Sequence, residues 1–96
     1  KGVAKQRRVK DMKHYGVLFN RKSGKVVKTL VEQFGSAFLK MYALGNVSAS
    51  RDFIVFSEEG IVVGYYEGKK NDMPTICRDM EGKRVEEFGF KVEDFN

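Results

Sequence analysis

His14 and Cys77 are the only histidine and the only cysteine in the sequence, and together they could supply a base and a nucleophile. Such a pair also needs a third group that orients the base, and nothing in the sequence brings the two side chains together or supplies that group. We therefore expect no catalytic residue, and we expect Cys77 to be a small, buried apolar residue. No metal ligand is expected either, because there is no second histidine and no Cys-x-x-Cys.

The glycines are the next candidates, because glycine-rich loops can cradle phosphate groups. A phosphate-binding loop has four residues between its first glycine and Gly-Lys-Ser/Thr, whereas seven residues separate Gly16 from Gly24-Lys25. Three later glycines recur every four residues, which does not fit the dinucleotide-binding pattern, at Gly60, Gly64 and Gly68. Turns or close packing account for them better, so we expect no cofactor.

Charge is unevenly distributed along the chain. Residues 1–28 contain ten basic residues and one acidic residue, a net charge of +9, whereas residues 29–96 contain eight basic and twelve acidic residues, a net charge of −4. This asymmetry points to a polyanionic partner. Basic side chains that neutralise phosphates release condensed cations, which gives affinity without sequence specificity. The phosphate contacts that we expect come from Lys5, Arg7, Arg8, Lys10, Lys13, Lys22 and Lys25.

Two other interpretations of the basic segment stay open. It can be a solvated linker or solubility tail, and the chain is then a protein-interaction or oligomerising domain that uses a hairpin edge or an apolar patch. Alternatively, the basic end of one copy meets the acidic part of another copy.

Apolar periodicity predicts where the secondary-structure elements lie. Apolar residues recur at three- and four-residue steps between Val26 and Tyr42, which predicts an amphipathic helix over residues 24–44, capped by Ser23 and ended by Gly45. A short apolar run predicts a strand over residues 15–19, and two runs joined by a short loop predict a β-hairpin over residues 52–66. Residues 75–80 fit either a helix that starts near Pro74 or a third strand, and two short helical turns are expected at residues 85–88 and 92–95.

These elements predict an α+β domain over residues 14–96, preceded by a basic arm over residues 1–13. One long amphipathic helix packs on a small antiparallel sheet built around the hairpin, with short helical turns at the C-terminus. The expected core residues are Leu30, Val31, Phe34, Phe38 and Met41 from the helix, opposite Ile54, Phe56, Ile61 and Val63.

The composition also bears on compartment and function. A single cysteine cannot form an internal disulfide, and no apolar run reaches the length of about 20 residues that crosses a bilayer. We therefore expect a cytoplasmic protein with no membrane span. The expected function is that of a non-enzymatic binding or regulatory module, either binding nucleic acid without sequence specificity through the basic N-terminal segment or binding protein.

Overall fold

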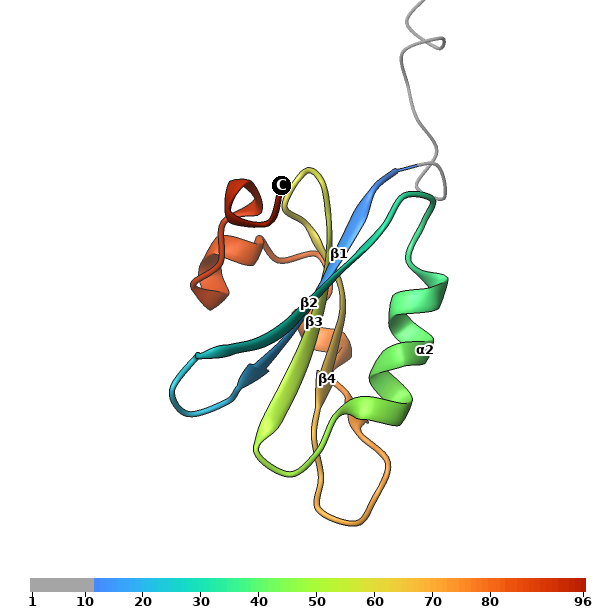
Figure 1. The fold of residues 1–96 in the computed structure, drawn as a ribbon, viewed down its shortest axis with the longest axis vertical. Coiled ribbons are helices and arrows are strands. Elements are labelled where there is room, and N and C mark those ends of the chain that lie inside the picture. Colours follow the sequence, from blue (N-terminus) through green and yellow to red (C-terminus); the bar gives the residue numbers. More distant parts are fainter. Residues whose placement is uncertain (1–11) are drawn as a thin grey trace, which may run out of the picture.

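A five-stranded antiparallel sheet is the frame of the domain (Figure 1). The structure is a computed structural model, and it describes residues 12–96. In chain order the strands are β1 (His14–Asn20), β2 (Val26–Glu32), β3 (Arg51–Ser57), β4 (Val62–Glu67) and β5 (Thr75–Ile76). Their order across the sheet is β2-β1-β3-β4-β5, so β2 lies at one edge and β5 at the other.

The central strands β1 and β3 are apolar on both faces because both faces of the sheet are covered. They pair residue for residue, from His14 opposite Ser57 to Asn20 opposite Arg51. All residues from 15 to 19 and from 52 to 57 are buried, which is the environment that a continuous apolar run predicts. The structure confirms both the predicted strand over residues 15–19 and the hairpin, whose turn contains Gly60 with a φ of 84°.

Two apolar cores lie on opposite faces of the sheet. Helix α2 (Ala37–Asn46) covers one face, where Leu39 and Ala43 pack against side chains of β1, β3 and β4. Three short 3-10 helices follow β5: η2 (Arg78–Met80), η3 (Val85–Phe88) and η4 (Val92–Phe95). The second, η2, contacts β4, whereas the segment that contains η3 and η4 covers the other face of the sheet. There Val85 and Phe90 pack on the opposite side of β1, β3 and β4. Figure 1 shows α2 and the C-terminal turns on either side of the sheet.

The helix predicted over residues 24–44 is wrong in its first half. Residues Val26–Glu32 form strand β2, and the helix begins only at Ala37. Gly35, which the pattern placed in mid-helix, has a φ of 84°, in the left-handed region where glycine is favoured, so the chain turns there. Residues 26–32 are also rich in β-branched side chains, which suit a strand. The domain is α+β as predicted, but the α-helix in residues 12–96 has ten residues and is not long.

The core predicted from that segment is mostly wrong as well. The side chains of Val31, Phe34, Phe38 and Met41 are exposed, by 47%, 75%, 55% and 71%. Leu30 is half-buried at the margin of the core under the helix. The buried side of α2 consists instead of residues that the pattern did not single out.

The core predicted from the hairpin is partly confirmed. Ile54 and Phe56 are fully buried, whereas Ile61 and Val63 are half-buried and Val62 takes the buried position. The pairing between β3 and β4 contains a register shift next to Phe56, so strict alternation does not continue from one strand into the next.

The C-terminal elements are short. Residues 75–80 contain both of the structures that the sequence left open, because β5 is followed by η2. The expected turns at residues 85–88 and 92–95 are confirmed as η3 and η4. No helix begins at Pro74, which is followed directly by β5.

Candidate interaction surface

The seven basic residues expected to contact phosphates do not come together in the described part of the chain. Lys5, Arg7, Arg8 and Lys10 lie outside residues 12–96. Lys13 directly precedes β1, whereas Lys22 and Lys25 lie in the turn at the opposite end of that strand. With a rise of about 3.3 Å per residue, β1 puts roughly 23 Å between Lys13 and this turn. The structure thus presents them as two separate groups.

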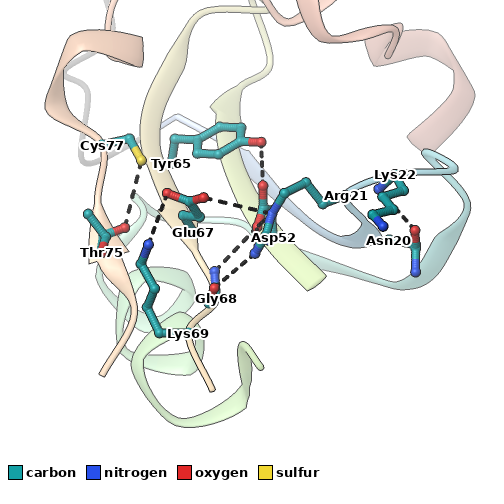
Figure 2. Close-up of polar contacts among 10 residues, drawn as sticks. All are labelled: Asn20, Arg21, Lys22, Asp52, Tyr65, Glu67, Gly68, Lys69, Thr75 and Cys77. Carbon is teal, nitrogen blue, oxygen red and sulfur yellow. Dashed lines mark hydrogen bonds and ion pairs between the residues drawn. The ribbon is translucent and has the colours of Figure 1, made fainter. Parts of the chain in front are cut away.

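Lys22 and Lys25 do not lie at a helix start, contrary to the sequence prediction. The side-chain Oδ1 of Asn20 accepts hydrogen bonds from the backbone N–H groups of Lys22 (3.0 Å, Figure 2) and Ser23 (2.9 Å). The predicted helix cap, Ser23, accepts a hydrogen bond from the backbone N–H of Lys25 at 3.2 Å. Because these backbone N–H groups already have hydrogen-bond partners, an anion that binds at this turn would contact the side chains of Lys22 and Lys25.

Arg21 lies in the same turn, and its partly exposed guanidinium group is bound to the buried carboxylate of Asp52 (Figure 2). The Asp52 carboxylate is buried, and its Oδ1 accepts a hydrogen bond from Arg21 Nε at 2.9 Å. Its Oδ2 accepts a hydrogen bond from the Tyr65 hydroxyl at 2.8 Å. Arg21 Nη2 also donates to the carbonyl oxygen of Gly68 at 2.8 Å, and the Gly68 N–H donates to Asp52 Oδ1 at 3.3 Å. These bonds join the β1–β2 turn to β3 and to the end of β4.

The electrostatics of this cluster indicate a structural role. Burial raises the pKa of the Tyr65 hydroxyl above its ordinary value, and the hydrogen bond to Asp52 and the charge of Asp52 raise it further. The hydroxyl is therefore protonated at neutral pH and is a donor to the carboxylate. Both oxygens of Asp52 have hydrogen-bond partners, which is what a buried carboxylate needs.

His14 and Cys77 are far apart in the sheet. His14 begins β1 and Cys77 follows β5, so three strand spacings, roughly 14 Å, separate their strands. His14 is fully buried, and its Nδ1 lies 2.9 Å from the carbonyl oxygen of Met12. Cys77 is half-buried rather than fully buried and is unpaired. Burial and then the charge of Glu67 raise the pKa of its thiol, which lowers the thiolate fraction.

The exposed apolar side chains gather on β2 and α2. Nine large apolar side chains in residues 12–96 are exposed, and seven of them come from the single stretch of residues 26–44. They are Val26, Val27, Val31, Phe34, Phe38, Met41 and Leu44. Val26 and Val31 are opposite Phe19 and Tyr15 of β1, so they lie on the sheet face away from α2. We give the name α2–β2 surface to the three exposed side chains between the end of β2 and the middle of α2, Phe34, Phe38 and Met41, together with the outer edge of β2. A concentration of exposed apolar side chains of this kind marks a binding site more often than a free surface.

The orientation of α2 brings its exposed aromatic side close to β2. Leu39 and Ala43, four residues apart, face the sheet. Tyr42 lies toward β2, because Lys28 Nζ is 5.8 Å from the centroid of its ring. Phe38 precedes Tyr42 by four residues and so lies on the same flank of the helix. This flank therefore adjoins the edge strand β2.

Two parts of this arrangement were missed by reasoning from the sequence. The apolar residues of the α2–β2 surface were recognised but were placed in the core. The partnership of Arg21 with Asp52 was not foreseen, although one signal for it exists. Asp52 begins an apolar run that forms a buried strand, and a buried carboxylate requires a cation or several donors nearby.

Comparison of the chain with protein families, with functionally described proteins and with solved structures gives no match. Within residues 12–96, no three His, Cys, Asp or Glu side chains gather as metal ligands would. In the same range no helix is both long and apolar enough to span a membrane. The described residues offer two candidates for a binding site, the α2–β2 surface and the basic side chains.

Proposed function

We propose that this domain is a non-enzymatic protein-interaction module and that it binds its partner on the α2–β2 surface. The observation that carries the proposal is that three large apolar side chains are exposed between the end of β2 and the middle of α2. Phe34, Phe38 and Met41 leave more than half of their surface in water. Each would stabilise a complex on burial, because fully burying such a side chain is worth about 1.5–3 kcal/mol.

The residue types and their surroundings support the same proposal. Aromatic residues and methionine are enriched at the centres of protein interfaces, where charged residues are depleted. Charged residues surround the apolar group on this domain, with Lys28 and Glu32 on β2 and Lys40 on the far flank of α2. An apolar centre with a polar rim is the usual anatomy of a protein interface.

A photoreactive phenylalanine analogue placed at position 38 tests the proposal in the cells that produce the protein. Because Phe38 is exposed, the change leaves the fold intact, and we expect a discrete cross-linked adduct of higher mass. The matched control carries the analogue at Lys91, an exposed residue in the C-terminal segment, and should give no such adduct. Adding Met41→Lys to the first variant should abolish the cross-link. The same adducts from both positions, or none from position 38, would refute the proposal.

Nucleic-acid binding is a second candidate, which the net charge of +9 in residues 1–28 favours. We propose for it phosphate contacts from the N-terminal basic residues together with Lys13, Lys22 and Lys25. A nucleic acid that contacts both Lys13 and the turn that contains Lys22 and Lys25 would have to extend over roughly 23 Å of the protein surface. This length corresponds to about seven base-pair steps of duplex DNA. Neutralisation of about five phosphates would make log K fall against log salt with a slope near −4 to −5.

Fluorescence anisotropy over a salt series tests this candidate with labelled duplex DNA, single-stranded DNA and RNA. The informative variant lacks residues 1–10 and keeps Met12, whose carbonyl oxygen accepts a hydrogen bond from the N–H of Gly35 at 2.9 Å. Loss of most affinity in this variant, together with the steep slope, supports nucleic-acid binding. Equal affinity of the intact chain and the truncated variant would show that residues 1–10 do not contribute to nucleic-acid binding.

A further inference from the structure

Within residues 12–96, strand β2 has a free backbone edge, because β1 is its neighbour on one side and it is the outermost strand of the sheet. In an antiparallel ladder, alternate residues direct their N–H and C=O groups to opposite neighbours, so half of these groups on β2 face away from β1. Such an edge is a template for a further strand. A lysine in mid-strand normally discourages this pairing, and Lys28 is in that position.

Lys28 is followed four residues later by Glu32, and neither forms an ion pair with another residue of the described chain. Lys28, Leu30 and Glu32 are opposite Leu18, Gly16 and His14 of β1, so all three side chains lie on the face that α2 covers. The sequence on this face of the edge strand is therefore cation, leucine, anion. Read in the antiparallel direction, it is complementary to itself.

We propose that the occupant of the α2–β2 surface is a second copy of this chain, whose β2 pairs antiparallel with β2 around a two-fold axis at Leu30. This inference rests on the proposed protein-interaction function. In this register Leu30 lies opposite the partner's Leu30, Lys28 opposite the partner's Glu32, and Glu32 opposite the partner's Lys28. A lysine on a free edge normally discourages pairing with another strand, but here each Lys28 is opposite a Glu32 of opposite charge, so pairing is not discouraged.

The charges select this register over its neighbours. A shift by two residues in one direction places Lys28 opposite the partner's Leu30, and a shift in the other direction places Glu32 opposite the partner's Leu30. Both shifts exchange two ion pairs for contacts between a charge and an apolar side chain, and opposite charges directly across a ladder are favourable. The register centred at Leu30 is the one that pairs both charges and both leucines.

The two-fold axis also accounts for the exposed side of α2. An axis perpendicular to the joined sheets places both α2 helices on the same face, one on each side of the β2–β2 seam. Phe38 lies on the flank of α2 that faces β2, so it faces the partner's helix across that seam. Phe34 lies between β2 and the start of α2, next to this seam. Met41 is two residues from both Leu39 and Ala43, so it lies on the side of α2 that faces away from the sheet. Pairing of the edges thus buries aromatic residues that the single copy leaves in water.

Charge-reversal variants and sedimentation velocity test the register. Lys28→Glu alone and Glu32→Lys alone each turn both ion pairs into like-charge pairs, so each should weaken self-association by about tenfold or more. An equimolar mixture of the two variants restores opposite charges at both places and should form a heterodimer. Lys40→Glu, with the same change in net charge on the other flank of α2, should dimerise like the parent.

A disulfide provides a second readout that does not depend on charge. In a Cys77→Ser background, Leu30→Cys should form an intermolecular disulfide on mild oxidation, because residues directly opposite each other in a ladder lie within disulfide range. Thr29→Cys is the matched control, since it lies opposite the partner's Val31 and should cross-link poorly. Equal cross-linking of the two variants, together with a mixture of charge variants that stays monomeric, overturns the proposed register.

The outcomes separate this inference from the function on which it rests. An adduct from position 38 with twice the mass of the chain supports both. An adduct with a different protein, combined with a parent chain that stays monomeric at its highest attainable concentration, overturns the second copy and leaves the interaction module. No adduct and no self-association overturn both.

Discussion

Phe38→Ala should destabilise the isolated domain only slightly, although its position in the sequence pattern suggests a core residue. Full burial of a phenylalanine side chain stabilises a fold by about 1.5–3 kcal/mol. Phe38 is 55% exposed, so the truncation should cost about half of that, roughly 0.7–1.4 kcal/mol. Alanine is also the better helix former, which offsets part of this loss. Phe53→Ala, at a fully buried position, should cost about 3–5 kcal/mol.

Urea unfolding of the parent, Phe38→Ala and Phe53→Ala provides the comparison, at a protein concentration low enough to keep the chain monomeric. If Phe38 lies in an interface between copies, its truncation should cost more as the concentration rises, because association stabilises the parent and not the variant. A loss for Phe38→Ala as large as that for Phe53→Ala at low concentration would refute the assignment of Phe38 to the surface.

Three further predictions, with five substitutions, test the polar cluster and the close packing around it. Asp52→Ala should lower the free energy of unfolding by about 2–4 kcal/mol in the same urea titration, less than the loss of a fully buried ion pair, because Arg21 is partly exposed. The control is Glu67→Ala, whose carboxylate is 4.0 Å from Arg21, and it should lower the free energy of unfolding by less than about 0.5 kcal/mol. Tyr65 has a folded-state pKa above its ordinary value of 10.0, so its contribution to stability is complete below pH 10 and is lost as the pH rises toward the folded-state pKa. The urea midpoint should therefore fall more steeply above pH 10 for the parent than for Tyr65→Phe, and identical slopes would contradict this account. Gly68→Ala should unfold the domain or destabilise it by more than about 3 kcal/mol, because the added Cβ would overlap the carbonyl oxygens of Ser48 and Arg51. Gly45→Ala is the control: space is open around this position, so the substitution should be neutral or stabilising. Thermal melting followed by circular dichroism compares the two variants.

The sequence predicts those parts of the fold in which local pattern and tertiary environment agree. The strand over residues 15–19 and the hairpin over residues 52–66 are apolar on both faces and are buried on both faces, so their pattern has one interpretation. The apolar pattern of residues 24–44 has two interpretations. Its apolar residues recur at helical spacing, but they belong to a strand and a helix that meet near Gly35, and the repeat continues across the break by coincidence. Glycine at that position and the valines before it are the local signals of the break.

Periodicity also cannot tell a core from an interface. Phe34, Phe38 and Met41 have the residue types of a core, and only the tertiary structure shows that no other part of residues 12–96 covers them. The cluster around Asp52 was out of reach for a different reason. It joins Arg21, Tyr65 and Gly68, which are neighbours only after the sheet has formed, and a carboxylate at the start of a strand does not identify its partners.

The two edges of the sheet have unequal lengths, and this limits how far the chain can assemble by strand addition. Strand β2 offers seven residues, whereas β5 covers only two residues of β4. Beyond β5, the next part of the β4 edge is bonded to the C-terminal segment, since Gly82 N–H donates to the Val62 carbonyl oxygen and Val62 N–H donates to that of Lys83, both at 2.8 Å. Pairing of two β2 strands consumes the long edge of each copy. The proposed pair would be closed and finite, and residues 12–96 would leave no long edge from which a fibre could grow.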